Sequence, residues 1–378
     1  MKLKKQLYRL LYKILYHLVK KDTICFIEDR ESAKYMNISV LYDALCSKAP
    51  CTRICDELCA KSICSLARSK VVLQDKSTKL MSSLKLGKDT DCVQLWHSSG
   101  LYKKVGFDAM RSDRRREAEY LRLKRIHGNT RYFIISDRKL VPFYAQAFSL
   151  NRERILPFGL VRTDRYYTID YAVNLAKIHE LHPETAGRKI LLYAPTYREV
   201  DSRCGRANVC LLDVEKLKKD LGDEWCFAMR RHPTLSAGTA DGWIDFSDLE
   251  QDVCLSVADA LATDYSSILF DYAFFHRPIY LFVPDVGAYK DKQRDFYVTP
   301  EELVGKNAVC KTTEDLVSCI RKSDAGDQHI WERYMGDCDG HSCERVAHFV
   351  LDRYFEGGAQ QAFRQNHACK AGSTCHES

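Results

Sequence analysis

Residues 258–272 read ADALATDYSSILFDY, and this stretch indicates the fold class. It begins with an apolar run typical of a buried strand, continues through a turn rich in hydroxyl groups, and is then expected to start a helix. Backbone N–H groups, the helix dipole and serine hydroxyls converge at such a turn, which makes it a typical phosphate site. Simple helix capping also suits these hydroxyls, so the stretch alone leaves both interpretations open. We predict phosphate contacts from Thr263, Asp264, Ser266 and Ser267.

The same alternation of short apolar runs and helical stretches continues on both sides of this segment. Further strands are expected at Ile24–Ile27, Val71–Leu73, Cys92–Leu95, Arg131–Ser136, Ile190–Tyr193, Cys226–Arg230 and Pro278–Val283. Helices are expected at Ser39–Ser47, Ala172–His179, Asp213–Leu221 and Glu314–Arg321. Strands that alternate with helices predict an α/β fold, in which parallel sheets carry helices on both faces.

A turn-rich segment at residues 181–188 separates two such series, and the length of 378 residues suits two α/β domains. We therefore predict two Rossmann-like domains that face each other across a cleft. The N-terminal domain is expected to span residues 22–180 and the C-terminal domain residues 181–356. The tail at residues 357–378 is polar, and we expect it to be disordered.

The first 21 residues, MKLKKQLYRLLYKILYHLVKK, predict an amphipathic helix. Leucine and isoleucine recur at helical spacing on one side, and Lys and Arg occupy the other. The apolar run is shorter than the ~20 residues that span a bilayer, and no signal-peptide cleavage site follows it. With Tyr8, Tyr12 and Tyr16, this helix suits an anionic membrane surface; packing on the protein itself is the alternative.

The net charge of +7 originates in this N-terminal segment. Its seven Lys and Arg residues are accompanied by no acid, so the totals of 58 basic and 51 acidic residues leave 51 of each for the rest of the chain. A nucleic-acid-binding protein usually spreads basic residues over a face of its body. The charge pattern therefore argues against a nucleic-acid partner.

Seventeen cysteines raise the question of disulfides or metal ligands. Secreted disulfide scaffolds are short and Cys-dense, whereas many cysteines here lie in apolar runs, so thiols in a reducing cytosol are expected. Near-helical spacing predicts that Cys51, Cys55, Cys59 and Cys64 share a helix face of small buried residues, and a metal site is the alternative. A second set is close enough in sequence to chelate a metal but lacks another pair of ligands, so we predict no metal site. That set is Cys338, His341 and Cys343.

Polar residues follow another expected strand in QLWHSSG, residues 94–100. Open α/β sheets place their ligands at the carboxyl ends of the strands, and His97 directly follows this one. An imidazole titrates near neutral pH and can accept a proton from a hydroxyl group. A structural role for this histidine is the alternative.

Two more strand ends carry candidate anion-binding groups. The segment YAPTYR supplies Thr196 and Arg198, either of which can hold an anion. The segment RRHP supplies Arg231 and His232, which form a phosphate-binding set or, alternatively, part of a solvated charge cluster.

Taken together, these segments resemble the CDP-glycerol glycerophosphotransferase family of teichoic acid synthesis. The resemblance runs over residues 24–288, through QLWH, KKVGFD, a G-x-x-R-x-D pattern at residues 159–164, YAPTYR, RRHP, ADALATDYSSILFDY and RPIYLFVPD. It implies a GT-B-like fold with the active site between the domains and with no metal or other cofactor. The CDP-linked donor would lie against the C-terminal domain, and the acceptor would approach from the N-terminal domain.

The resemblance also implies a reaction and its residues. A hydroxyl group of a lipid-linked cell-envelope glycan would attack the β-phosphorus of a CDP-polyol such as CDP-glycerol, and CMP would leave. His97 would be the general base, and His232 with Arg231 would stabilise the departing phosphate. Arg294 would add charge on the donor side. On the acceptor side, the residues would be Ser98, Ser99, Lys103, Lys104 and Asp108. The protein would work as a peripheral protein at the cytoplasmic face of a bacterial cell membrane.

The chain departs from the family pattern at three places. Ser98-Ser99 replaces the usual Gly-Thr, and Val161 replaces the usual Pro. Asp295 replaces the usual Gly after Arg294, which places an acid beside a donor-side arginine. These changes leave the choice of acceptor and polyol open. The alternatives are a GT-B glycosyltransferase that uses a nucleotide sugar and a non-catalytic, membrane-bound protein that binds nucleotide diphosphates.

Overall fold

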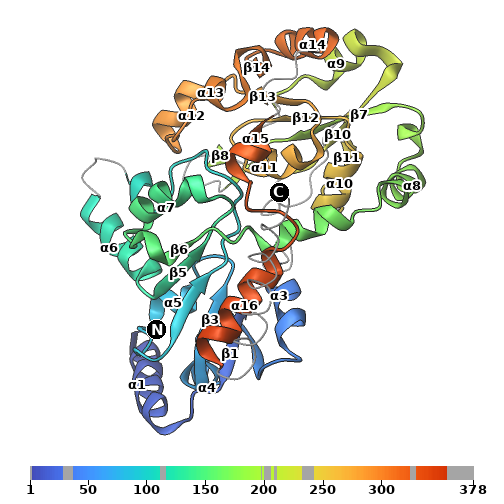
Figure 1. Cartoon of the computed structure of the whole chain (residues 1–378). Coiled ribbons are helices and arrows are strands. Elements are labelled where there is room, and N and C mark those ends of the chain that lie inside the picture. Colours follow the sequence, from blue (N-terminus) through green and yellow to red (C-terminus); the bar gives the residue numbers. More distant parts are fainter. Residues whose placement is uncertain are drawn as a thin grey trace, which may run out of the picture.

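The computed structural model describes residues 2–28, 37–110, 116–196, 198–199, 206–207, 211–231, 242–323 and 329–355. The predictions for the tail at 357–378 and for His232 lie outside the described residues. The chain forms two lobes, each built around one parallel sheet, as Figure 1 shows.

The first sheet has six parallel strands in the order β2-β1-β3-β4-β5-β6. The strands are β1 (Thr23–Glu28), β2 (Cys51–Cys55), β3 (Ser69–Gln74), β4 (Asp91–Gln94), β5 (Thr130–Ile134) and β6 (Ile155–Leu156). The helices of this part are α1 (Lys2–Leu18), α3 (Asn37–Leu45), α4 (Ala60–Arg68), α5 (Lys79–Ser83), α6 (Arg116–His127) and α7 (Val141–Phe148). Alternate residues of β1 enter different cores: Phe26 packs with α3, whereas Ile27 packs with α4. Both faces are therefore covered, which explains the continuous apolar runs.

The second sheet also has six parallel strands, in the order β11-β10-β7-β12-β13-β14. They are β7 (Lys189–Ala194), β10 (Trp225–Met229), β11 (Ile244–Asp245), β12 (Ala260–Thr263), β13 (Ile279–Phe282) and β14 (Val309–Cys310). A separate antiparallel pair consists of β8 (Arg198–Glu199) and β9 (Arg206–Ala207). The two parallel sheets confirm the predicted α/β fold.

The helices of the second half are α8 (Tyr171–Leu181), α9 (Val214–Leu221), α10 (Gln251–Val257), α11 (Ile268–Tyr272), α12 (Val286–Lys292), α13 (Pro300–Val304), α14 (Thr313–Lys322), α15 (Ile330–Tyr334) and α16 (Ser342–Tyr354). Short 3-10 helices connect many elements. They are η1 (Gly106–Ala109), η2 (Arg138–Leu140), η3 (Arg152–Arg154), η4 (Val161–Thr168), η5 (Pro183–Thr185), η6 (Gly222–Glu224), η7 (Ala273–Phe275) and η8 (Lys306–Ala308).

The last helix, α16, crosses back to the first lobe. Figure 1 shows it running from the second lobe to the side of the first sheet. It contacts α3 and η4, and its residues Val346 and Val350 are buried in the same core as Ile24 and Phe26. The segment 181–356 is therefore not one structural unit, because its final helix completes the N-terminal domain.

The prediction that four cysteines share one helix face was wrong. Cys51 and Cys55 lie at the two ends of β2, an edge strand that pairs with β1, while Cys59 precedes α4 and Cys64 lies within it. The four residues are spaced like a helix, but the chain changes direction between them. No cysteine in the described residues forms a disulfide.

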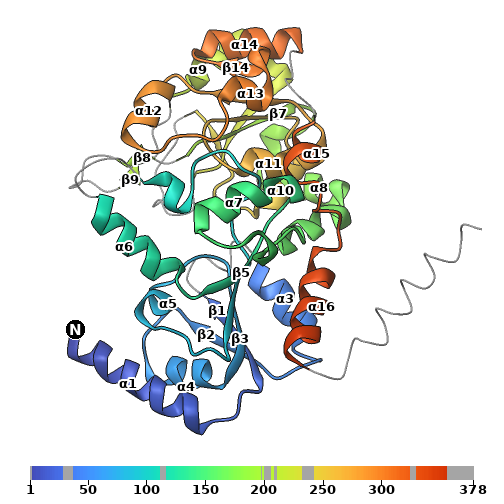
Figure 2. The same ribbon diagram turned by 60° about the vertical axis from the view of Figure 1, so that its left-hand side comes forward.

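The N-terminal helix α1 packs on the protein with its tyrosine face. Tyr12 is buried, and its hydroxyl accepts a hydrogen bond from the amide of Gly87 at 3.1 Å. The Tyr16 hydroxyl donates to Asp89 Oδ2 at 2.7 Å. Figure 2 shows α1 beside α4 at the end of the first lobe. The face that remains exposed carries an apolar row, formed by Leu3, Leu7, Leu10, Ile14 and Leu18.

The tyrosine face of α1 therefore packs on the protein, and the leucine and isoleucine row points outward. Within the ranges described above, no helix combines the length and the apolarity needed to cross a membrane.

Candidate active site

Three of the polar segments lie side by side at one edge of the second sheet. They follow β10, β7 and β12, which are neighbours in that sheet. The amide of Arg230 donates to the Tyr193 carbonyl oxygen at 2.9 Å, and this bond joins the first two segments. The amide of Thr196 donates to Asp264 Oδ1 at 2.8 Å, which joins the second and the third. The sheet thus gathers anion-binding candidates that lie far apart in the sequence.

Two members of the 263–267 turn shape it from within. The Thr263 side chain is fully buried and donates a hydrogen bond to the Ala194 carbonyl oxygen at 2.7 Å. Asp264 is also buried, and its Oδ1 accepts from the amides of Thr196 and Tyr265. The geometry therefore shows that Thr263 and Asp264 join strand ends, and their predicted phosphate contacts stay a prediction.

Ser266 and Ser267 are the half-buried members of this turn and lie just before α11. Ser266 Oγ accepts from the amide of Ile268 at 3.3 Å, whereas Ser267 occupies the N-cap position and makes no side-chain capping bond. Because α11 has only five residues, its dipole contributes little. Anion binding at this turn depends mainly on hydroxyl and backbone N–H groups.

The candidate donor-side arginines differ in their surroundings. Arg231 is half-buried; its Nε donates to Ser247 Oγ at 3.2 Å, and its guanidinium forms an ion pair with Asp245. A bound phosphate would therefore share Arg231 with a carboxylate. Arg294 is exposed, and the backbone of Arg198 lies in β8.

His97 is half-buried in a tight turn directly after β4. The preceding residue, Trp96, has a φ of 61°, which is uncommon for a bulky side chain. The Trp96 ring packs against Phe133 and Phe148 at centroid distances of 5.0 and 5.4 Å, and against the His97 ring at 4.7 Å. The His97 imidazole therefore packs against a Trp96 ring that is itself held by Phe133 and Phe148.

The turn after His97 touches the second domain. Gly100 has a φ of +57°, and a Cβ atom at this position would lie 2.5 Å from the ring of Phe270 in α11. Ser99 is 1% exposed and donates a hydrogen bond to Asp271 Oδ2 at 2.9 Å. Ser99 therefore lies in the domain interface, whereas Ser98 is half-buried, and the acceptor-side role predicted for both stays a prediction.

The other acceptor-side candidates meet the second domain at residues 295–297. The amide of Lys104 donates to the Asp295 carbonyl oxygen at 2.9 Å, and its Nζ forms an ion pair with the Asp295 carboxylate at 2.5 Å. Lys103 forms a β-bridge with Phe296, and Asp108 accepts from the Tyr297 hydroxyl at 2.8 Å. The acid at position 295 therefore pairs with a lysine from the other domain.

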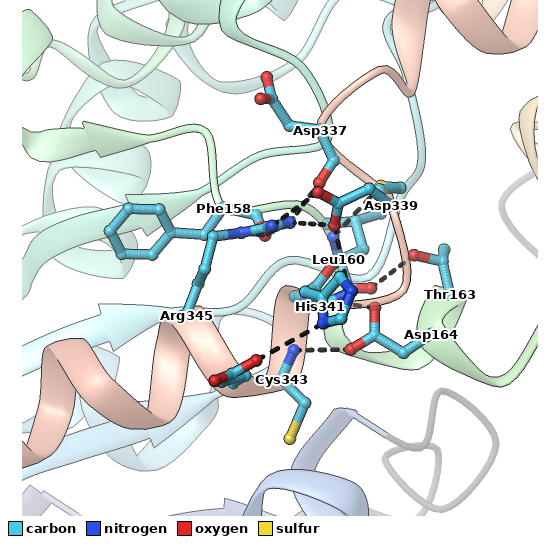
Figure 3. A network of polar contacts seen from close by, with 12 residues as sticks. Phe158, Leu160, Thr163, Asp164, Asp337, Asp339, His341, Cys343 and Arg345 are labelled. Atoms are coloured by element: carbon cyan, nitrogen blue, oxygen red, sulfur yellow. Dashed lines mark hydrogen bonds and ion pairs between the residues drawn. The ribbon is translucent and has the colours of Figure 1, made fainter. Parts of the chain in front are cut away.

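The G-x-x-R-x-D pattern is a junction of the two domains. Gly159 has a φ of +77°, and a Cβ atom there would lie 2.4 Å from the Asp337 carbonyl oxygen. Arg162 forms a bidentate ion pair with Asp271 of α11, at 2.6 and 3.0 Å. Asp164 accepts hydrogen bonds from the amides of Ser342 and Cys343 at 3.0 and 2.7 Å, which caps α16 (Figure 3).

Around this cap, Arg345 of α16 fixes the loop that leads into the helix. Its guanidinium donates to the Phe158 and Asp337 carbonyl oxygens at 2.9 and 2.5 Å, and it forms an ion pair with Asp339 (Figure 3). Cys338 and Cys343 belong to this structural region. The described part of the chain holds no group of three His, Cys, Asp or Glu side chains that is placed to bind a metal.

The pair Arg162–Asp271 is buried and charged. Burial by itself would lower the pKa of Arg162, but the facing Asp271 carboxylate raises it above its ordinary value. Arg162 therefore stays charged, and its contact with Asp271 joins the two domains by charge as well as by hydrogen bonds.

Comparison with known proteins gives the family. A family model described as CDP-glycerol:poly(glycerophosphate) glycerophosphotransferase matches residues 10–352. The chain belongs to this family. The matched range includes both domains of this glycerophosphotransferase-family chain and all but the end of α16.

The teichoic acid ribitol-phosphate primase of Bacillus spizizenii is 32% identical over 300 residues, which cover 76% of this chain and 76% of the relative. The teichoic acid glycerol-phosphate primase of Bacillus subtilis is 25% identical over 307 residues, which cover 77% and 75%. The wall teichoic acid polymerase TagF superposes with a TM-score of 0.75 at 21% identity, over 93% of this chain and 93% of that chain. A UDP complex of MnaA from S. aureus superposes with a TM-score of 0.54 at 10% identity, over 88% and 96%. At such identities the two solved structures establish the fold alone.

Sequence reasoning missed the residues that join the site across the domains. Arg162 and Asp271 both lie inside quoted motifs, so their charges were visible signals, but nothing in the sequence paired them. Asn37, which also belongs to this contact, lies outside every motif and gave no signal.

Proposed function

We propose that this glycerophosphotransferase-family chain transfers a polyol phosphate, glycerol phosphate or a close relative, from a CDP-polyol to a teichoic-acid-type polymer or lipid-linked glycan, with release of CMP. One observation carries the proposal. The His97 turn of one domain contacts α11 of the other, directly after the Ser266–Ser267 turn. A candidate base and a candidate phosphate site therefore belong to one contact between two domains.

In the proposed reaction, His97 removes the proton from the acceptor hydroxyl as that oxygen attacks the β-phosphorus. The bond to the CMP oxygen breaks, and CMP leaves with the negative charge. Phosphoryl transfer of this kind depends on positioning and on neutralising charge. Ser266, Ser267 and the amides of their turn would hold the diphosphate. Arg231 and His232 would stabilise the leaving CMP, with Arg231 exchanging part of its contact with Asp245 for the phosphate.

We assign further donor-side charge to Arg198 and Arg294. Thr196 contributes from the end of β7, where its amide donates a hydrogen bond to Asp264. Lys103, Lys104 and Ser98 remain our candidates for the acceptor side. We propose that the reaction needs no resident metal or other cofactor. Chelation with EDTA should then leave the rate of CMP release unchanged.

The exposed row of α1 supports peripheral attachment to the cytoplasmic face of the cell membrane. Leu7 and Ile14 of this row point outward, and basic side chains such as Arg9 and Lys13 are exposed on the same helix. Apolar side chains beside basic ones suit a membrane interface with anionic lipids. Attachment there would bring the site to a lipid-linked acceptor.

The nucleotide donor that the protein uses distinguishes the proposed function from its alternatives. We would supply CDP-glycerol, CDP-ribitol and a UDP-sugar in parallel, each with a lipid-linked glycan acceptor, and measure nucleotide release. CDP-ribitol is included because one relative, at 32% identity, is a ribitol-phosphate primase. Release of CMP from a CDP-polyol supports the proposal. Turnover of the UDP-sugar alone indicates a glycosyltransferase, and binding without turnover indicates a non-catalytic protein.

A further inference from the structure

A buried polar contact fixes the chain on the N-terminal side of His97. The Asn37 side-chain amide donates to the Trp96 carbonyl oxygen at 3.1 Å, and its Oδ1 accepts from the amide of Arg162 at 2.8 Å. Asn37 is fully buried, so these bonds are shielded from water. They help to hold Trp96 in its left-handed conformation, which is unfavourable for this residue and persists only where the surrounding structure fixes it.

A second contact fixes the chain on the C-terminal side. The Ser99 hydroxyl donates to Asp271 Oδ2 at 2.9 Å and accepts from Arg162 Nη2. The same carboxylate accepts two bonds from Arg162 and one from the Tyr166 hydroxyl at 3.0 Å. Asp271 is 2% exposed and Arg162 is 9% exposed, so the Ser99 hydroxyl bonds to a desolvated ion pair.

These two contacts share Arg162, and they reach the other domain through Asp271. Asp271 lies in α11, which begins directly after Ser266 and Ser267. A shift of the Ser99 hydroxyl relative to Asp271 is therefore a shift of the His97 turn relative to the proposed phosphate site.

We propose that Ser99 is a positioning residue, whose hydroxyl fixes the His97 turn to the Arg162–Asp271 pair and so sets the place of the imidazole relative to the Ser266–Ser267 turn. The proposal rests on the proposed function, because there His97 is the base. Displacing a reacting group by 1 Å can lower the rate about 100-fold, so the loss of a single buried hydrogen bond can lower kcat strongly.

The test compares three variants. Ser99→Ala removes the hydroxyl, Ser99→Thr keeps it, and Ser256→Ala is the matched control. Ser256 is equally buried, and its hydroxyl accepts from Asn174 at 2.9 Å, away from the His97 turn. We expect Ser99→Ala to lower kcat about 10- to 100-fold with the KM for the CDP-polyol within about twofold. Ser99→Thr should restore kcat, and Ser256→Ala should leave it unchanged. An unchanged kcat in Ser99→Ala overturns the proposal.

A second readout does not need turnover. The imidazole signals of protein labelled with ¹⁵N-histidine are assigned to His97 by their loss in His97→Gln. In Ser99→Ala these signals should shift or broaden, and in Ser256→Ala they should stay in place. His97 signals that are unmoved in Ser99→Ala overturn the proposal. If wild-type protein releases no CMP from any donor, the proposed function fails, while this spectrum still decides whether Ser99 positions His97.

Discussion

Replacing Asp271 with alanine should destabilise the protein by about 3–5 kcal/mol, since it leaves a buried guanidinium without its carboxylate. The structure supports a value in this range. Asp271 is 2% exposed, and Arg162 bonds to it through two donors at 2.6 and 3.0 Å. The Tyr166 and Ser99 hydroxyls lose their acceptor in the same substitution.

A matched comparison comes from a more exposed ion pair between the domains. The side chains of Lys104 and Asp295 are 33% and 37% exposed. Water can replace much of that contact, so Asp295→Ala should cost less than about 1 kcal/mol. The assay is urea unfolding followed by tryptophan fluorescence, with the free energy of unfolding extrapolated to water for both variants. Equal losses in Asp271→Ala and Asp295→Ala would refute the reasoning.

A double substitution separates charge from packing. Arg162→Met combined with Asp271→Leu replaces the pair by apolar side chains, an exchange that is often neutral when the volumes are similar. Most of the stability lost in Asp271→Ala should therefore return. If the double variant is as unstable as Asp271→Ala, then the shape of the interface and not the buried charge accounts for the loss.

Three further predictions follow from the cap, the exposed ion pair and the N-terminal helix. Asp164→Ala should lower the free energy of urea unfolding by about 1–2 kcal/mol, because it removes the cap of α16; an unchanged value would contradict that role. The hydrogen bond from Lys104 lowers the pKa of Asp295, so the pair stabilises the protein above the ordinary Asp pKa and this contribution is lost as the pH falls through the lowered value. The difference in thermal stability between wild type and Asp295→Asn should therefore shrink on acidification, and a constant difference would exclude the linkage. Leu7→Glu with Ile14→Glu should abolish sedimentation with anionic vesicles while leaving the melting temperature unchanged, since both side chains point outward; equal sedimentation would remove α1 as the attachment site.

Much of the fold follows from the sequence because its strands are buried on both faces. Runs such as Ile190–Tyr193 have no polar position to accommodate, so they stand out against the helices around them. The edge strand β2 was missed because Thr52 and Arg53 break its apolar pattern, which an edge strand tolerates. The return of α16 was missed because its partners, α3 and η4, lie far from it along the chain, and a local pattern carries no information about them.

The candidate site was also predictable only in part. The strand-end position of His97 and the neighbourhood of Thr196 and Asp264 follow from the alternation of strands and helices. The alternation of strands and helices does not show whether a hydroxyl group points outward or inward. The hydroxyls of Ser99 and Thr263 point inward, to partners from other segments. Sequence patterns identify which residues gather at a sheet edge, whereas tertiary packing decides which of them can meet a ligand.

The most direct test of the central claim is acceptor-dependent release of CMP. Purified protein is incubated with CDP-glycerol or CDP-ribitol and a detergent-solubilised, lipid-linked glycan, beside His97→Ala at equal concentration. A positioned general base is worth about 10²–10⁴-fold. The account predicts CMP release that requires the acceptor and that falls by at least the lower of these factors in His97→Ala, while the variant retains the wild-type melting temperature. Release at the wild-type rate in His97→Ala, or no release from either CDP-polyol, would contradict it.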